Sequence, residues 1–190
     1  MSGAEFHVHG PHEHEVEHQA QHGDAFASRI AVVTAIFATI GALFGYMGGA
    51  TQNDALLFKN EAAILKTDAS DKWNFYQAKS NKQNLAELGA TLTTGDQQAR
   101  YRSEAERYNK EKEAIMKDAQ RVEAQGKEAD KMSEASMHVH HRWAQAMTLI
   151  QISIALAAIT ILTRNRGLAY LSYAGAALSV VLGALAAAHI

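Results

Sequence analysis

Hydrophobic and polar residues are separated along this chain into long blocks. A bilayer core about 30 Å thick is crossed by a helix of roughly 20 mostly apolar residues. Three blocks of that length contain no Asp, Glu, Lys or Arg, and their apolar residues lie on every helical face. The alternative interpretation is the core of a soluble helical bundle, but soluble helices are rarely apolar on every face. The predicted transmembrane helices are residues 29–51, 143–163 and 168–190.

A polar insert, residues 52–142, separates the first two predicted spans and carries 15 basic and 15 acidic side chains. Most of its residues are good helix formers. Residues 91–96, with three Thr and a Gly, are its one strong interruption and lie near its midpoint. We therefore predict a long antiparallel helical hairpin that continues from the first and second spans. A single solvated helix, stabilised by ion pairs four residues apart, is the alternative.

The second helix of the insert repeats apolar and small residues at alternating spacings of four and three, which is the coiled-coil period. These positions are Tyr101, Ala105, Tyr108, Lys112, Ile115, Ala119, Val122, Gly126, Ala129, Ser133, Ser136 and His140. The first helix offers a bulkier stripe, namely Leu65, Ala69, Trp73, Tyr76 and Ser80. We expect its large residues to interdigitate with the small ones. The predicted fold class is all-α, a membrane protein with three spans and a coiled-coil-like hairpin.

The remaining segments are a His-rich polar leader, residues 1–28, and a short basic turn, residues 164–167. Arg29 and the two arginines of the turn fall on the same side of a three-span protein, and the positive-inside rule assigns that side to the cytoplasm. The N-terminus is then cytoplasmic and the hairpin periplasmic, although Arg142 favours the opposite orientation. The leader lacks the basic start and short apolar run of a secretory signal.

Small residues recur every four positions in the first and third spans. In a bilayer, this spacing allows close helix packing. The residues are Gly41, Gly45 and Gly49 in the first span and Gly175, Ser179 and Gly183 in the third. We expect the two spans to face each other or copies of themselves, and hence a homo-oligomer or a larger membrane complex around a lipid-embedded chain.

Composition excludes several function classes. The net charge of −2 and the lack of a basic stripe with interleaved aromatic residues argue against nucleic acid as a partner. The chain has no Cys, so it has neither disulfide bonds nor thiolate metal sites. No ionisable residue lies at the centre of a span, which argues against transport through this chain alone. No phosphate-binding loop, activated nucleophile or catalytic carboxylate pair is found, so we expect no enzymatic activity.

Histidines are the candidate metal ligands. The leader interleaves Glu with six of them, and imidazole and carboxylate groups suit Zn, Cu or Ni. They are His7, His9, His12, His14, His18 and His22. Residues 14–18 match the H-E-x-x-H pattern of zinc proteases, a match expected by chance in a segment so rich in His and Glu. A flexible polar tail is the alternative interpretation, and no cofactor is certain.

A second histidine cluster precedes the second predicted span and comprises His138, His140 and His141. His138 and His141 are one helical turn apart, so both could reach one ion or respond to pH near neutrality. The alternative is a set of interfacial polar residues beside Trp143, which has the position of a membrane-interface anchor.

The run Trp73-x-x-Tyr76-Gln77-Ala78-Lys79-Ser80, together with the three-span layout, resembles a family of bacterial membrane proteins, domain of unknown function 4337. The resemblance covers nearly everything after residue 25 and excludes the leader. It implies a bacterial inner (cytoplasmic) membrane protein and brings no activity, cofactor or catalytic residue with it.

Helical spacing divides this run between two faces. Trp73 and Tyr76 share one face, while Phe75 and Lys79 share another. The first face would pack within the hairpin, and the second is available to a second subunit; a role in the hairpin core alone is the alternative. Trp73 and Tyr76 are therefore predicted interface residues.

These patterns predict a non-enzymatic integral membrane scaffold or accessory subunit. It would oligomerise, or join a larger membrane complex, through its hairpin and its small-residue transmembrane faces. The alternative function is a metal-binding or metal- or pH-sensing membrane protein that uses the leader or the His138, His140 and His141 cluster.

Overall fold

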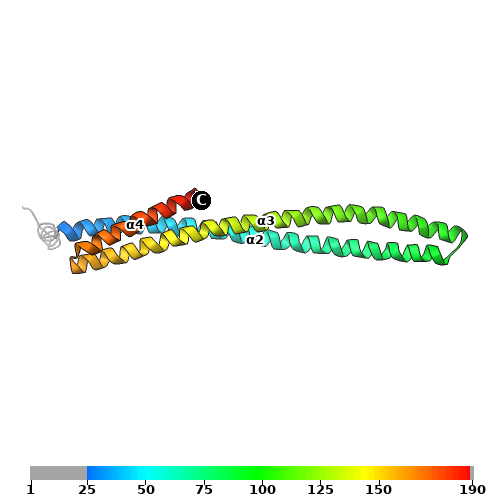
Figure 1. Cartoon of the computed structure of the whole chain (residues 1–190), viewed down its shortest axis with the longest axis horizontal. Helices are drawn as coiled ribbons and strands as arrows, with labels where there is room; N and C mark the ends of the chain where they lie inside the picture. The colour runs from blue at the N-terminus through cyan, green and yellow to red at the C-terminus, as the bar shows by residue number, and fades with distance from the viewer. Residues whose placement is uncertain (1–24, 189–190) are drawn as a thin grey trace, which may run out of the picture. The chain divides into compact units, whose positions relative to one another are not determined.

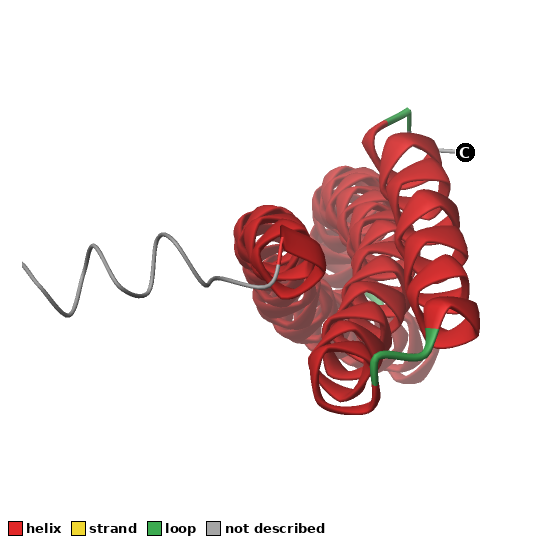
Figure 2. Ribbon diagram, turned by 90° about the vertical axis from the view of Figure 1, so that its left-hand side faces the viewer, coloured by secondary structure: helices red, strands yellow, loops and turns green. Residues whose placement is uncertain are grey.

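The computed structural model describes residues 25–188, and its regular structure is entirely helical. Its helices are α2 (Ala25–Leu92), α3 (Gly95–Thr163) and α4 (Arg166–Ala187), in the order shown in Figure 1. Across residues 25–188 Figure 2 contains helices and connecting loops and no strand. The prediction of an all-α chain is confirmed.

The break between α2 and α3 falls inside the predicted interval, residues 91–96. Gly95 has φ of 65°, a left-handed conformation that costs glycine little and other residues more. The amide of Gln98 donates a hydrogen bond to the carbonyl of Ala90 across the turn, at 2.9 Å. A side chain of α3 thus satisfies one of the backbone acceptors that the end of α2 leaves open.

The second break also falls where the sequence predicts it. Arg164 has φ of 54°, and Asn165 caps α4 by accepting a hydrogen bond from the backbone N–H of Gly167 at 2.8 Å. Asn is among the preferred residues at this capping position because its side-chain oxygen satisfies an exposed N–H. Each of the two loops that connect the described helices is two residues long.

Each of the three helices contains a stretch long and apolar enough to cross a membrane. The chain divides into two compact units, one combining the N-terminal part up to Gly48 with the part from His141 onward, and the other running from Gly49 to His140. We call the described part of the first, residues 25–48 and 141–188, the apolar unit. The second, residues 49–140, is the charged unit.

The interior of the apolar unit is made mainly of small residues. On α4 they alternate at spacings of three and four, namely Ala169, Ser172, Ala176, Ser179, Gly183 and Ala186. The buried hydroxyl of Ser172 donates to the carbonyl of Ser153 at 2.7 Å, and that of Ser179 donates to the carbonyl of Ala146 at 2.7 Å. Two direct side-chain bonds therefore join α4 to the backbone of α3.

Most of the predicted glycine faces meet α3 rather than each other. A Cβ added to Gly41 would lie 3.2 Å from Ile150, and one added to Gly175 would lie 2.5 Å from the hydroxyl of Ser153. Gly183 instead lies against the ring of Phe44 on α2. The first and third spans thus share α3 as a partner within one chain and meet each other at Gly183 and Phe44, while packing on copies stays a prediction.

One end of the apolar unit is closed by a small hydrophobic cluster. Ile30, Ala157 and Ala169 are buried together, with Phe26 and Ile161 packed against them. The beginning of α2 therefore lies beside the turn between α3 and α4. The arginine that precedes Ile30 and the two arginines of that turn belong to the same end of this unit.

We predict that Gly183→Val destabilises the apolar unit. A Cβ at this position would lie 2.7 Å from Phe44 and 3.4 Å from Trp143, two rings already packed at a centroid distance of 5.5 Å. Overpacking of this kind costs about 1–3 kcal/mol. The thermal unfolding midpoint of the purified chain in detergent should fall. Gly49→Val is the matched control, because nothing lies within 4 Å of its Cβ, and its midpoint should not fall.

Candidate functional site: a groove on the charged unit

The two helices of the charged unit meet through small residues repeated every seven positions. They are Ala55, Ala62 and Ala69 on α2, and Ala119, Gly126 and Ser133 on α3. The hydroxyl of Ser133 donates to the carbonyl of Ala55 at 2.8 Å, so a one-carbon side chain is long enough to reach the opposite backbone. A Cβ on Gly126 would lie 3.7 Å from the carbonyl oxygen of Ala62. The two backbones approach each other closely here.

This seam differs from the expected packing of large residues against small ones. Of the predicted α2 stripe, only Ala69 is buried, while Leu65, Trp73, Tyr76 and Ser80 are half-buried at its edges. Large side chains cannot occupy the centre of a seam where the backbones are this close. Sequence reasoning missed Ala55 and Ala62, although their spacing of seven residues was a usable signal.

Lysines and carboxylates bridge the two helices along their length. Lys59 bonds Asp130 at 2.5 Å, Lys72 bonds Asp118 at 2.7 Å, and Lys79 bonds Glu111 at 2.5 Å. Residue numbers rise along α2 as they fall along α3, so the two segments are antiparallel. The pairs also fix the register, because a shift of one turn would separate every lysine from its carboxylate.

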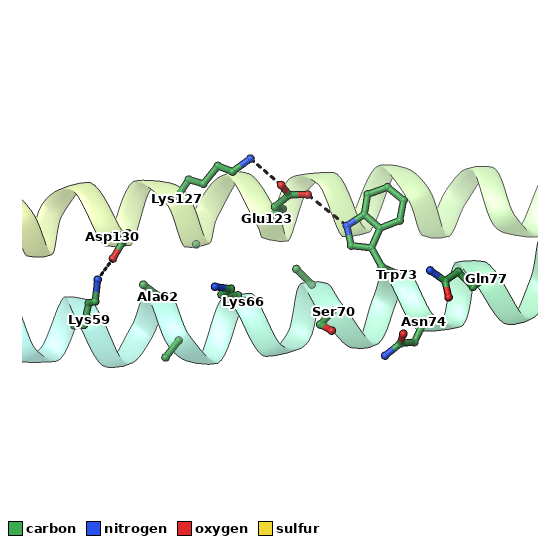
Figure 3. A pocket seen from close by; sticks show the side chains of 13 residues that line it. Lys59, Ala62, Lys66, Ser70, Trp73, Asn74, Gln77, Glu123, Lys127 and Asp130 are labelled. Atoms are coloured by element: carbon green, nitrogen blue, oxygen red, sulfur yellow. Dashed lines mark hydrogen bonds and ion pairs between the residues drawn. The ribbon is translucent and has the colours of Figure 1, made fainter.

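A groove of about 790 Å³ runs along one side of this pair of helices (Figure 3). Small residues form much of its surface: Ala62, Ala63, Ala69, Ser70 and Gly126. Polar and aromatic side chains complete it: Lys59, Lys66, Trp73, Asn74, Gln77, Glu123, Lys127 and Asp130. The groove exists because the seam residues are too short to fill the space beside them.

Trp73 is held in the wall of the groove by Glu123. Its indole N–H donates to the carboxylate at 3.4 Å, and Lys127 bonds the other carboxylate oxygen at 2.7 Å (Figure 3). The hydrogen bond from Lys127, followed by that from Trp73, lowers the pKa of Glu123 below its usual value of 4.5. Tyr76 packs edge-on to Trp73 at 5.6 Å between ring centroids.

The residues that line the groove suit the binding of a partner. The residues that line it include neither His nor Cys, and Glu123 and Asp130 are already bound to lysines. Lys66 is exposed and makes no hydrogen bond or ion pair within the described residues. An apolar floor beside an uncommitted cation suits a partner that carries apolar side chains and carboxylates.

The other face of the aromatic run is more exposed. The Phe75 side chain is 53% exposed, and the ammonium of Lys79 lies 5.3 Å from its ring centroid. The same ammonium lies 5.5 Å from the ring of Tyr108 on α3 while it bonds Glu111. Trp73 and Tyr76 contribute to the helix pair, as the spacing predicted, and Phe75 remains largely uncovered.

The predicted histidine sites receive no structural support. In residues 25–188, no three His, Cys, Asp or Glu side chains converge on a point that could hold a metal ion. His138, His140 and His141 are therefore not part of a three-ligand cluster in these residues, and a site that uses His138 and His141 as a pair stays a prediction. The leader histidines lie outside the described residues: His7, His9, His12, His14, His18 and His22.

A comparison with protein families matches residues 26–189 to a single description, Domain of unknown function (DUF4337). The chain belongs to this family. The match includes α2, α3 and α4 almost completely and leaves out most of the leader, as the resemblance of the Trp73–Ser80 run implied. No curated protein and no solved structure matches the chain.

We predict that Ala119→Leu pushes the two helices of the charged unit apart. Ala119 is fully buried in the seam, and the larger side chain would cost about 1–3 kcal/mol through overpacking. The expected result is a lower thermal midpoint in detergent, followed by circular dichroism. Ala124→Leu makes the same substitution at an exposed position five residues along the same helix and should leave the midpoint nearly unchanged. Equal effects of the two substitutions would contradict the seam.

Acid should weaken the pairing of the two helices. The pKa values of Glu111 and Asp118 lie below their usual 4.5 and 3.8, chiefly because Lys79 and Lys72 donate hydrogen bonds to them. Groups with a lowered pKa in the folded state stabilise it above their usual pKa and lose that contribution as the pH falls through the folded value. The contribution is therefore complete at pH 7 and is lost progressively as the pH falls below 4.5 for Glu111 and below 3.8 for Asp118.

Trp73 provides the measurement for this acid effect. In a Trp143→Phe background it is the only tryptophan, so its emission reports the Glu123 contact. We expect the emission to change as the pH is lowered from 7 to 3, with a midpoint below 4.5, the usual value for glutamate. Glu123→Gln should reduce that change to the part caused by Glu111 and Asp118. A midpoint above 4.5 would show that a group other than Glu123 controls the emission.

Proposed function

We propose that this chain is a non-enzymatic membrane scaffold or accessory subunit. In this proposal the apolar unit is embedded in a lipid bilayer, and the charged unit is a coiled-coil-like helical hairpin that binds other subunits. The hairpin oligomerises the chain or attaches it to a larger membrane complex.

The observation that carries the proposal is the inverted distribution of residue sizes in the apolar unit. Its interior is mainly Gly, Ala and Ser with a few large residues, among them Ile30, Trp143 and Ile150, whereas most of its large apolar side chains are partly or largely exposed. The most exposed include Val32, Ile36, Leu43, Leu162, Tyr170 and Val181. In water this arrangement would expose an extended apolar surface, whereas in lipid small residues at helix contacts and large ones facing the acyl chains are the normal pattern.

Two features of the charged unit support a hairpin that binds other proteins. The seven-residue repeat of small residues and the cross-helix ion pairs are typical of an antiparallel coiled coil. The aromatic Phe75 and several large aliphatic side chains on α2, including Ile64 and Leu85, remain exposed. Exposed apolar residues on an otherwise highly charged surface commonly mark a protein–protein contact.

The proposed location is the bacterial inner membrane, with the N-terminus in the cytoplasm. Arg29 and the arginines of the α3–α4 turn belong to the same end of the apolar unit, where Ile30 packs on Ala157 and Ala169. The positive-inside rule favours the cytoplasm for this end. One pass of α2 across the bilayer then brings the hairpin to the periplasmic side.

The metal-binding alternative is not favoured by any observation on the described residues. His138, His140 and His141 are not joined by a third ligand, and the leader lies outside residues 25–188. It stays a prediction for the leader histidines and for a metal- or pH-sensing role of His138, His140 and His141.

The proposal predicts that the full-length chain stays in the membrane fraction after an alkaline carbonate wash. Native mass spectrometry of the solubilised chain should then detect assemblies heavier than the 20.6 kDa monomer. The extra mass should be a multiple of the chain or a co-purifying membrane protein. Gly183→Val is the control for non-specific association, because loosening the apolar unit exposes more of its helices. If assembly is specific, this substitution should not increase the assembled fraction.

Two results would overturn the proposal. Extraction of the folded chain by carbonate would remove the membrane anchor. A strictly monomeric particle without a co-purifying protein, in several mild detergents and in lipid nanodiscs, would remove the scaffold role.

A further inference from the structure

We propose that the groove of the charged unit receives the opposite flank of α2 from a second copy of this chain. Copies then join side by side, with the flank of one in the groove of the next. This inference rests on the proposed scaffold function and specifies its partner and its surface. Four observations carry it: the sizes of the two surfaces, their charges, their positions along α2, and the common orientation of copies that share one membrane.

The first observation is a ridge of large apolar residues on the flank of α2 away from the groove. Leu57, Ile64 and Phe75 are 58%, 69% and 53% exposed. At 3.6 residues per turn, they lie about 160° around the helix axis from the groove residues Lys59 and Lys66. We call Leu57, Ile64 and Phe75 the ridge.

The ridge and the groove are complementary in size. The groove follows α2 from Lys59 to Gln77, a distance of about 27 Å at 1.5 Å per residue. Its floor is alanine and glycine, which leave room for side chains from outside. The ridge supplies large side chains over a similar length, from Leu57 to Phe75, so each branched or aromatic side chain can enter a space that a small residue leaves open.

The unpaired charges beside the two surfaces are opposite in sign. The acids near the ridge are Glu61, Asp68 and Asp71, of which Asp68 pairs with Lys72. The groove is lined by Lys59, Lys66 and Lys127 and by two carboxylates that pair with Lys59 and Lys127. Glu61 and Asp71 make no hydrogen bond or ion pair within the described residues, and neither does Lys66. Contact between a ridge and a groove brings unlike charges together, whereas contact between two ridges brings acids together and is disfavoured.

Position and symmetry favour the same arrangement. Copies that share one membrane have the same orientation, so a rotation about the membrane normal relates them and keeps each residue at its height. The ridge and the groove occupy the same stretch of α2 and can therefore meet without any shift. Because they are different surfaces of one chain, the contact is heterologous, and its repetition by rotation closes a ring.

Cysteine crosslinking tests this contact directly, because the chain contains no Cys. Ile64→Cys places a thiol on the ridge and Ala63→Cys places one in the groove, about 1.5 Å apart in height along the helix axis. We expect the two single variants, coexpressed in one membrane with different tags and mildly oxidised, to form a mixed disulfide dimer. The double variant should form a ladder of oligomers that ends at the closed ring.

The matched control combines Ile64→Cys with Gln125→Cys. Gln125 is exposed and lies on the flank of α3 away from the groove. The pairing of Lys72 with Asp118 places it at about the height of Ile64. This pair should crosslink far less. Equal crosslinking of the control, efficient dimerisation of Ile64→Cys alone, or no mixed dimer would each overturn the proposed contact.

Native mass spectrometry of the unsubstituted chain keeps this failure separate from failure of the scaffold function. If the unsubstituted chain assembles but the Ile64→Cys and Ala63→Cys variants form no crosslink, the ridge-and-groove contact is overturned and the scaffold role stays in place. Binding of a different membrane protein in the groove would do the same. A monomer without any partner would overturn both.

Discussion

The close approach of helix backbones through small side chains is the constraint on which the rest of this structure depends. In the charged unit it is achieved by Ala62 against Gly126, and in the apolar unit by Gly41 and Gly175 against α3. Hydroxyl groups can reach a carbonyl on the next helix only at this separation, as Ser133 and Ser179 do. Larger residues at these positions would remove both the packing and the hydrogen bonds.

In the proposed membrane arrangement, the same device serves two different chemical environments. In lipid, apolar burial gives helices little reason to associate, so dispersion contacts and interhelical hydrogen bonds must hold them together. In water, an alanine seam buries little apolar area and stabilises weakly by itself. The charged unit adds lysine–carboxylate pairs such as Lys79–Glu111, whose main contribution is to fix the register, because exposed ion pairs are individually weak.

The sequence predicted the helical elements well because charge-free blocks and a Thr-Gly break are local signals. Both interhelical turns lie where those signals are, and the α3 positions Ala119, Gly126 and Ser133 are buried as their spacing predicted. The partner surfaces could not be predicted to the same degree. Alanine is favourable anywhere in a helix, so the buried role of Ala62 is hidden in an Ala-rich sequence, and a four-residue glycine pattern does not specify which helix will occupy it.

A small-residue seam also determines what the outside of the helix pair looks like. Side chains that are too short to fill the space between two helices leave a groove beside them, and large residues displaced from the seam must lie at its edges or on the outer flanks. Trp73 illustrates the first outcome and Ile64 the second. The features that allow the two helices to pack closely thus create the complementary groove and ridge. Stability within one chain and recognition between chains are therefore linked through the same choice of alanine and glycine.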